Sequence, residues 1–225
     1  MIYFILVISV TRIYVVRHCE TDANANKIFQ GHTDNDVNEL GAKQLEALSK
    51  RFKNVELDKV LTSPLTRTQR TAKAIVGDKN IPLVICDGLI ELNGGVYEGK
   101  TYEEIGTEYP QFRVIWQSEP WRFAPEKGES MVHAYHRIWE TVLQLARDNK
   151  GETLALATHG GVLRCLLCKL MKDDIKKLPE IPFGLNTAVS LIEFDDSMTP
   201  SIIYYNDASH LPVSLKNKNA KVPLK

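Results

Sequence analysis

Short apolar runs rich in β-branched residues alternate along this chain with stretches of helical periodicity. The apolar runs predict strands at residues 13–16, 60–62, 83–86, 153–157, 188–194 and 202–205. Apolar positions three or four residues apart predict helices at 45–52, 65–76, 131–145 and 162–170. Such alternation is typical of a parallel sheet covered by helices on both faces. The pattern therefore predicts an α/β fold, a three-layer α/β/α sandwich with a mostly parallel central sheet.

Polar side chains with distinctive chemistry follow four of the predicted strands. Arg17 and His18 follow the first strand, and Arg67 lies shortly after the second. Glu91 follows the third strand and its turn, and His159 follows the fourth. Ligands of parallel sheets sit outside the carboxyl ends of the strands. We therefore expect two arginines, two histidines and one carboxylate around a single cleft.

These residue types together suit phosphoryl transfer. Two arginines offer planar sets of donors that balance most of a phosphate dianion. Histidine can bind phosphate or attack phosphorus, and a carboxylate can protonate a leaving oxygen. Gly160 opens a helix directly after His159, which leaves backbone donors free for an anion. Taken singly, each of these residues could be an ordinary structural or surface residue, but their coincidence after four strands favours a phosphate site.

Five segments of the chain resemble the histidine phosphatase superfamily, which contains cofactor-dependent phosphoglycerate mutases and related phosphatases. The segments are YVVRHCETDANANKIFQG, TSPLTRTQRTA, ELNGGVYEG, KGES and ATHGGVLR. They span roughly residues 12–170 and occur in the order that this family uses. The resemblance implies a phosphoglycerate mutase-like fold.

The resemblance also implies a role for each matched residue. His18 would be the phosphorylated nucleophile and Glu91 the proton donor. The phosphoryl group would be bound by Arg17, Arg67 and His159. Matched positions expected to bind substrate are Asn24, Gln30, Gly31 and Gly160. Cys19 stands where the family motif has glycine, and its thiol adds bulk beside the nucleophile without removing a catalytic group.

Alternative sites for a metal ion are weaker. Cys165 and Cys168 form a CxxC pair, but they lie in an apolar helical pattern, and no second pair at suitable spacing completes a zinc site. We expect them to be buried thiols. His133 and His136 are three residues apart at the margin of a packed helix. Glu98 follows Glu91 but is expected to support a turn. The sequence therefore predicts no metal and no cofactor.

Composition and charge limit the partners. The 225 residues are 44% apolar and 25% charged, which fits one soluble domain spanning 1–225. Because 28 basic residues balance 28 acidic ones, no global field attracts nucleic acid or an anionic membrane. The apolar first ten residues are too short to span a bilayer. Four unevenly spaced cysteines indicate a reducing compartment. We expect a cytoplasmic protein that binds a small phosphorylated metabolite, with a homodimer left open.

The predicted function is a metal-independent phosphatase that hydrolyses phosphate monoesters through a phosphohistidine. The alternatives are a cofactor-dependent phosphoglycerate mutase and a non-catalytic phosphate-binding module on the same fold. Residues 101–127 are irregular and predict a short helical flap, whereas the mutases that the sequence resembles carry a longer, more basic insertion here. This difference favours hydrolysis. Side chains of the flap that could select the leaving group are Tyr102, Arg113, Trp116, Trp121 and Arg122.

Overall fold

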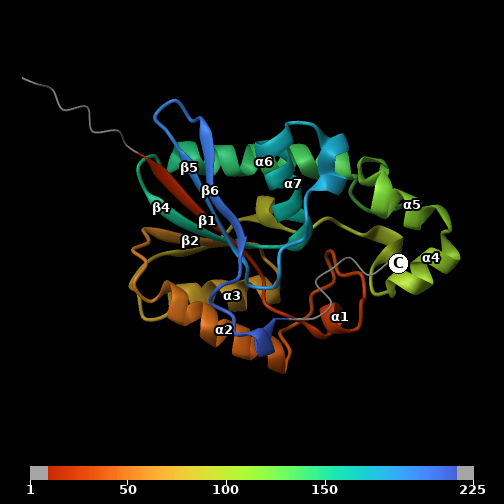
Figure 1. Ribbon diagram of the computed structural model, residues 1–225, viewed down its shortest axis with the longest axis horizontal. Coiled ribbons are helices and arrows are strands. Elements are labelled where there is room, and N and C mark those ends of the chain that lie inside the picture. Colours follow the sequence, from red (N-terminus) through yellow and green to blue (C-terminus); the bar gives the residue numbers. More distant parts are fainter. Residues whose placement is uncertain (1–9, 217–225) are drawn as a thin grey trace, which may run out of the picture.

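The computed structural model describes residues 10–216, so the apolar start at 1–9 lies outside the described residues (Figure 1). Six strands form one sheet in the order β3-β2-β4-β1-β5-β6. Their bounds are β1 (Thr11–Arg17), β2 (Lys59–Thr62), β3 (Leu83–Ile85), β4 (Thr153–Thr158), β5 (Val189–Phe194) and β6 (Pro200–Asp207). The first four run parallel, β5 is antiparallel to β1, and β6 is antiparallel to β5. The predicted α/β fold with a mostly parallel sheet is confirmed.

Helices cover both faces of this sheet. The α-helices are α1 (Asp22–Ala25), α2 (Glu39–Phe52), α3 (Thr66–Val76), α4 (Tyr102–Glu108), α5 (Gln111–Ser118), α6 (Met131–Asp148) and α7 (Gly160–Lys172). Short 3-10 helices are η1 (Asp87–Leu89), η2 (Gly95–Tyr97), η3 (Pro120–Arg122), η4 (Ile175–Glu180) and η5 (Val213–Leu215). Figure 1 shows α2 and α3 on one face and α6 and α7 on the other. No helix of the described chain is both long and apolar enough to cross a bilayer.

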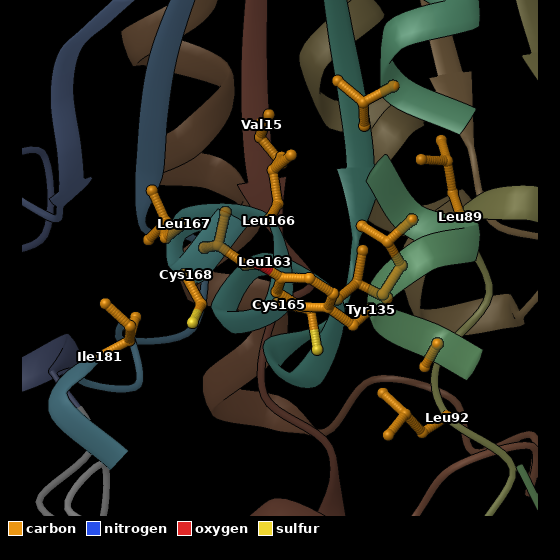
Figure 2. Packing of buried hydrophobic residues seen from close by; sticks show 14 of the residues in the cluster. Val15, Leu89, Leu92, Tyr135, Leu163, Cys165, Leu166, Leu167, Cys168 and Ile181 are labelled. Carbon is orange, nitrogen blue, oxygen red and sulfur yellow. The ribbon is translucent and has the colours of Figure 1, made fainter. Parts of the chain in front are cut away.

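Side chains of β1 point alternately to the two faces of the sheet, and each face has its own hydrophobic core. Ile13 and Val15 belong to the cluster that includes the apolar faces of α6 and α7, whereas Val16 belongs to the cluster with α2 and α3. Figure 2 shows the first cluster, in which Cys165 and Cys168 lie among the leucines of α7. Both cysteines are fully buried and free. The prediction of buried helix thiols is therefore confirmed.

Aromatic rings attach α4 and α5 to the rest of the domain. Trp116 stacks on Phe112 with ring centroids 5.6 Å apart, and it meets the edge of Phe29 at 5.5 Å. Phe29 lies in the segment after α1, and α1 follows His18 closely in the sequence. Such ring pairs contribute beyond their buried area. They hold α4 and α5 against the segment that borders the predicted cleft.

Candidate active site

The carboxyl ends of β1, β2 and β4 bring the predicted residues together. His18 follows β1, Arg67 lies in the first turn of α3 after β2, and His159 follows β4 as the N-cap of α7. Their side chains are buried, and the rings of His18 and His159 have centroids 5.3 Å apart. Arg17 and Glu91 line one cavity with His18. The predicted cleft therefore exists at the predicted edge of the sheet.

One contact determines the tautomer of His18. Its Nδ1 lies 2.6 Å from the carbonyl oxygen of Cys19. A carbonyl can only accept, so Nδ1 carries the hydrogen and Nε2 keeps its lone pair. Burial first, and then the cations Arg67 and Arg17, hold the pKa of His18 well below its ordinary value. The result is a neutral imidazole whose Nε2 is free to act as a nucleophile.

The two arginines are fixed by carbonyl groups and keep donors unused. Arg67 donates to the carbonyl oxygens of Thr33 and Gly31, each at 2.8 Å. Arg17 donates to the carbonyl of Gly184 at 2.6 Å. In both residues Nε is buried without a hydrogen-bond partner. Each guanidinium is thus held in place by neutral groups, and its charge remains available to an anion.

His159 and Gln30 also present unpaired polar atoms. Nε2 of His159 lies 2.8 Å from the hydroxyl oxygen of Ser63, while its Nδ1 has no partner. The side-chain oxygen of Gln30 accepts from the Thr21 hydroxyl at 3.0 Å, and its Nε2 has no partner. Seven buried side-chain atoms of residues 10–216 lack a partner, and four of them belong to predicted site residues. Because buried polar groups are normally paired, this concentration indicates a site for an anion.

Glu91 is held by the start of α7. Its carboxylate accepts from the backbone N–H groups of Gly161 at 2.9 Å, Val162 at 3.2 Å and Leu92 at 3.0 Å. A Cβ at Gly161 would lie 2.6 Å from this carboxylate, so a larger residue there would displace the Glu91 side chain. The free backbone donors that we expected for an anion at the two glycines are therefore partly used by Glu91. Gly160 itself lines the cavity, as predicted for a substrate-binding position.

Gly31, predicted to contact substrate, is not among the residues that line the cavity. Its N–H donates to Glu98 at 3.0 Å, and a Cβ would lie 2.1 Å from the Leu92 carbonyl. The Glu98 carboxylate also accepts from backbone or hydroxyl groups of His32, Thr33 and Gly94. These donors, against the opposing effect of burial, lower the pKa of Glu98. Gly31 and Glu98 together shape the loop that Arg67 binds.

Cys19 turns out to pack away from the cavity. It is fully buried, is not among the lining residues, and its backbone N–H donates to the Thr71 hydroxyl of α3 at 3.2 Å. Burial raises the pKa of its thiol to about 12. The bulk that this residue adds is therefore accommodated against α3. The thiol remains protonated near neutral pH and is therefore a poor nucleophile.

The cavity has a volume of about 130 Å³ and mixes predicted with unpredicted residues. Asn24 and Gln30 line it, whereas Arg67 and His159 are fully buried and are not among the lining residues. Sequence reasoning assigned no role to several further lining residues, among them Lys27, Arg164, Phe183 and Asn186. Of the five flap residues that we considered for leaving-group selection, the lining includes Tyr102 and Trp116 but not Arg113, Trp121 or Arg122.

The side chains considered as alternative metal ligands have other contacts or are buried in the core. His133 is exposed on α6 and its Nδ1 contacts the Glu129 carboxylate at 2.6 Å. Cys165 and Cys168 lie in the core, where burial raises the pKa of each thiol. Within residues 10–216, no three side chains of His, Cys, Asp or Glu gather into a group that could hold a metal ion.

Comparisons with known proteins extend this picture over most of the described chain. The family model of the histidine phosphatase superfamily (branch 1) matches residues 13–208. Phosphoserine phosphatase 1 of Hydrogenobacter thermophilus is 29% identical over 201 residues, which cover 89% of this chain and 94% of that protein. The match to residues 13–208 thus includes every predicted site residue and all of the strands except the first two residues of β1.

Solved structures share the fold. Bacillus stearothermophilus YhfR matches with a TM-score of 0.84 and 33% identity, covering 89% of this chain and 98% of that chain. A phosphoserine phosphatase of Entamoeba histolytica in complex with 3-phosphoglyceric acid matches with a TM-score of 0.79 and 25% identity, covering 90% and 100%. By family model, sequence and fold, the chain belongs to the histidine phosphatase superfamily and is a phosphoric monoester hydrolase.

Proposed function

We propose that this protein hydrolyses small phosphate monoesters by passing the phosphoryl group first to Nε2 of His18 and then to water, without a metal ion. The observation that carries the proposal is the 2.6 Å contact between His18 Nδ1 and the Cys19 carbonyl, which leaves the lone pair on Nε2. Unpaired buried nitrogens of Arg17, Arg67 and His159 lie near this nucleophile. The guanidinium groups of Arg17 and Arg67 supply the positive charge that a phosphoryl group requires.

In the first proposed step, His18 Nε2 forms a bond to phosphorus while the bond from phosphorus to the leaving oxygen breaks. The Glu91 carboxyl group gives its proton to that oxygen, and the alcohol departs. In the second step, the Glu91 carboxylate takes a proton from water as the water oxygen attacks phosphorus. The bond from phosphorus to Nε2 then breaks and releases inorganic phosphate. Arg17, Arg67 and His159 stabilise the equatorial oxygens in both steps.

Water, not a second substrate hydroxyl, is the proposed acceptor. The flap over the cavity consists of two short helices, α4 and α5, and contributes the aromatic side chains Tyr102 and Trp116 to the lining. A mutase must retain its phosphorylated intermediate while the bound bisphosphate reorients, which requires many groups that hold the substrate and exclude water. The short aromatic flap offers few such groups.

Incubation with 3-phosphoglycerate and a trace of 2,3-bisphosphoglycerate, after exhaustive chelation of metals, tests this proposal. We expect release of inorganic phosphate without formation of 2-phosphoglycerate. Formation of 2-phosphoglycerate much faster than phosphate release would instead show a mutase. Phosphate release that requires added zinc or magnesium would contradict the metal-independent mechanism.

The leaving group is proposed to carry a carboxylate. Beyond Arg17, the cavity is lined by two cations, Lys27 and Arg164. Arg164 lies with its guanidinium carbon 4.2 Å from the Phe183 ring centroid and donates to the carbonyls of Ile181 and Leu178. Neither cation forms an ion pair with a described acidic residue. Phosphoserine, named in two of the relatives, has a carboxylate of the required kind.

Replacing Lys27 by methionine is expected to lower kcat/KM for phosphoserine by roughly tenfold, the effect of one lost hydrogen bond to a charged group. Phosphoethanolamine, which lacks only the carboxylate, should be hydrolysed at an unchanged rate by the variant. Lys73→Met, on the exposed surface of α3, is the matched control and should affect neither substrate. Equal losses on the two substrates would place Lys27 outside carboxylate recognition.

A further inference from the structure

Thr187 occupies an unusual backbone conformation directly beside the nucleophile. It lies in the turn before β5, where the Ala188 N–H donates to the Leu185 carbonyl at 3.0 Å. Its φ angle is 59°, in the left-handed region that favours glycine or asparagine over a β-branched residue. Thr187 is also completely buried. A threonine persists in such a conformation only when its surroundings impose it.

The turn formed by Asn186 and Thr187 binds the main chain at His18. The Thr187 N–H donates to the carbonyl oxygens of Arg17 at 3.1 Å and His18 at 3.3 Å. The Asn186 amide donates to the same His18 carbonyl at 2.9 Å. On the opposite side, the His18 N–H donates to the Thr158 carbonyl of β4 at 2.8 Å. The backbone of the nucleophile is therefore held between β4 and this turn.

His210 links Thr187 to a distant helix. Arg51 of α2 donates to His210 Nδ1 at 3.1 Å, and His210 Nε2 lies 3.2 Å from the Thr187 hydroxyl oxygen. Because a guanidinium can only donate, Nδ1 accepts, and the ring hydrogen is on Nε2, where it donates to Thr187. Arg51 is itself fixed by an ion pair with Asp207 at 2.7 Å. The contacts run from α2 through the turn after β6 to Thr187.

Two further observations support a fixed, neutral His210. Burial first, and then Arg51, lower the pKa of His210 to about 4, although Asp207 opposes the shift. The ring is therefore uncharged at neutral pH and can accept from Arg51. Ala208 and Leu211, which flank His210 in the turn after β6, pack in one buried cluster with Ala188. The turn after β6 thus packs against the turn that contains Thr187.

We propose that His210 is a positioning residue for the phosphoryl transfer: by donating to Thr187 it fixes the left-handed turn whose N–H groups hold the backbone of Arg17 and His18. This inference rests on the proposed phosphohistidine mechanism. Loss of the contact lets the turn relax and shifts Nε2 of His18 relative to phosphorus. A displacement of the order of 1 Å in a reacting group lowers rates by about 100-fold. The expected defect is therefore in chemistry, not in substrate binding.

Two pairs of variants test the contact from both ends. His210→Leu removes the donor, whereas His210→Gln can still accept from Arg51 and donate to Thr187. Thr187→Val removes the hydroxyl at constant shape, whereas Thr187→Ser keeps it. The matched control is Thr11→Val, because Thr11 is a fully buried threonine whose hydroxyl accepts from Gly151 at 2.9 Å, at the opposite end of β1. Thermal unfolding establishes that each variant is folded at the assay temperature.

The readout is the rate at which label from a phosphorylated substrate enters His18, measured by rapid quench, together with KM. We expect His210→Leu and Thr187→Val to slow labelling by roughly 10- to 100-fold with KM changed less than about threefold. The two conservative variants and Thr11→Val should label at nearly the wild-type rate. The double variant should be no slower than Thr187→Val alone, because both changes remove one contact.

Other results would overturn the inference. If His210→Leu labels at the wild-type rate, or if His210→Gln is as slow as His210→Leu, the hydrogen bond does not position His18. Effects that multiply in the double variant would show that His210 acts by another route. If Thr187→Val fails to fold, the labelling rates of the two His210 variants still test whether the hydrogen bond positions His18. Absence of label in the wild-type protein would refute the phosphohistidine mechanism instead, so the two failures are distinguishable.

Discussion

Replacing His18 by alanine is expected to abolish both turnover and covalent labelling. Its Nε2 is the free nitrogen of a neutral, buried ring, and unpaired nitrogens of Arg17, Arg67 and His159 lie near it. Loss of a nucleophile typically lowers kcat by roughly 10⁴-fold or more. Rapid quench with a substrate labelled in its phosphoryl group measures the effect. The wild-type protein should hold label that survives base and is released by acid, as a bond from phosphorus to nitrogen requires.

His133→Ala is the matched control for this experiment, because His133 is exposed on α6 and belongs to no part of the cavity. That variant should form the same label at the same rate. Retention of base-stable label in His18→Ala would show that another residue is the nucleophile. His159 would then be the first alternative, because its ring lies beside that of His18.

Glu91→Gln is expected to have an effect that depends on the leaving group. The amide cannot give a proton to the departing oxygen, and loss of a positioned acid lowers rates by about 10²–10⁴. Alkyl phosphates should be slowed by this amount. With p-nitrophenyl phosphate, whose leaving group is stable without a proton, the loss should be much smaller. The ratio of the kcat losses on the two substrates separates the loss of leaving-group protonation from other effects of the substitution.

The control for Glu91→Gln is Glu103→Gln, the same change on the exposed surface of α4. It should leave both substrates unaffected. Equal losses on the two substrates in Glu91→Gln would contradict a role in proton transfer. Such a result would point instead to the contacts with Gly161 and Val162, which an amide in place of the carboxylate would disturb.

The layers and strands of the fold could be predicted because apolar runs mark the largely buried strands β1, β2, β4 and β5. The apolar run of β3 also predicted a strand, although its three residues are exposed. The direction of β5 could not be predicted in this way, since an apolar run has no polarity of its own. Only the relative direction of β5 and β6 could be predicted, because residues 195–199 alone separate the two strands. Parallel strands need a crossover of a dozen or more residues, so this connection permits only an antiparallel pair.

The antiparallel direction of β5 relative to β1, which the sequence pattern did not predict, explains which site residues were missed. The rule that ligands sit outside carboxyl ends led to the residues after β1, β2 and β4. Because β5 runs antiparallel to β1, the residues before it lie at the same edge. Asn186 and Thr187 occupy this place and hold His18. Gly31 was assigned to substrate because it belongs to a matched motif, whereas packing against Leu92 is what requires a glycine there.

The position of β1 in the sheet also affects how the protein is made. It is the first described strand to be synthesised, but it lies in the interior of the sheet between β4 and β5. Neither neighbour exists until Thr153 and the residues beyond it have left the ribosome. At roughly 5–20 residues per second, this interval is of the order of ten seconds. Throughout it, the apolar strand that precedes His18 has two unpaired edges, which makes the nascent chain a target for chaperones.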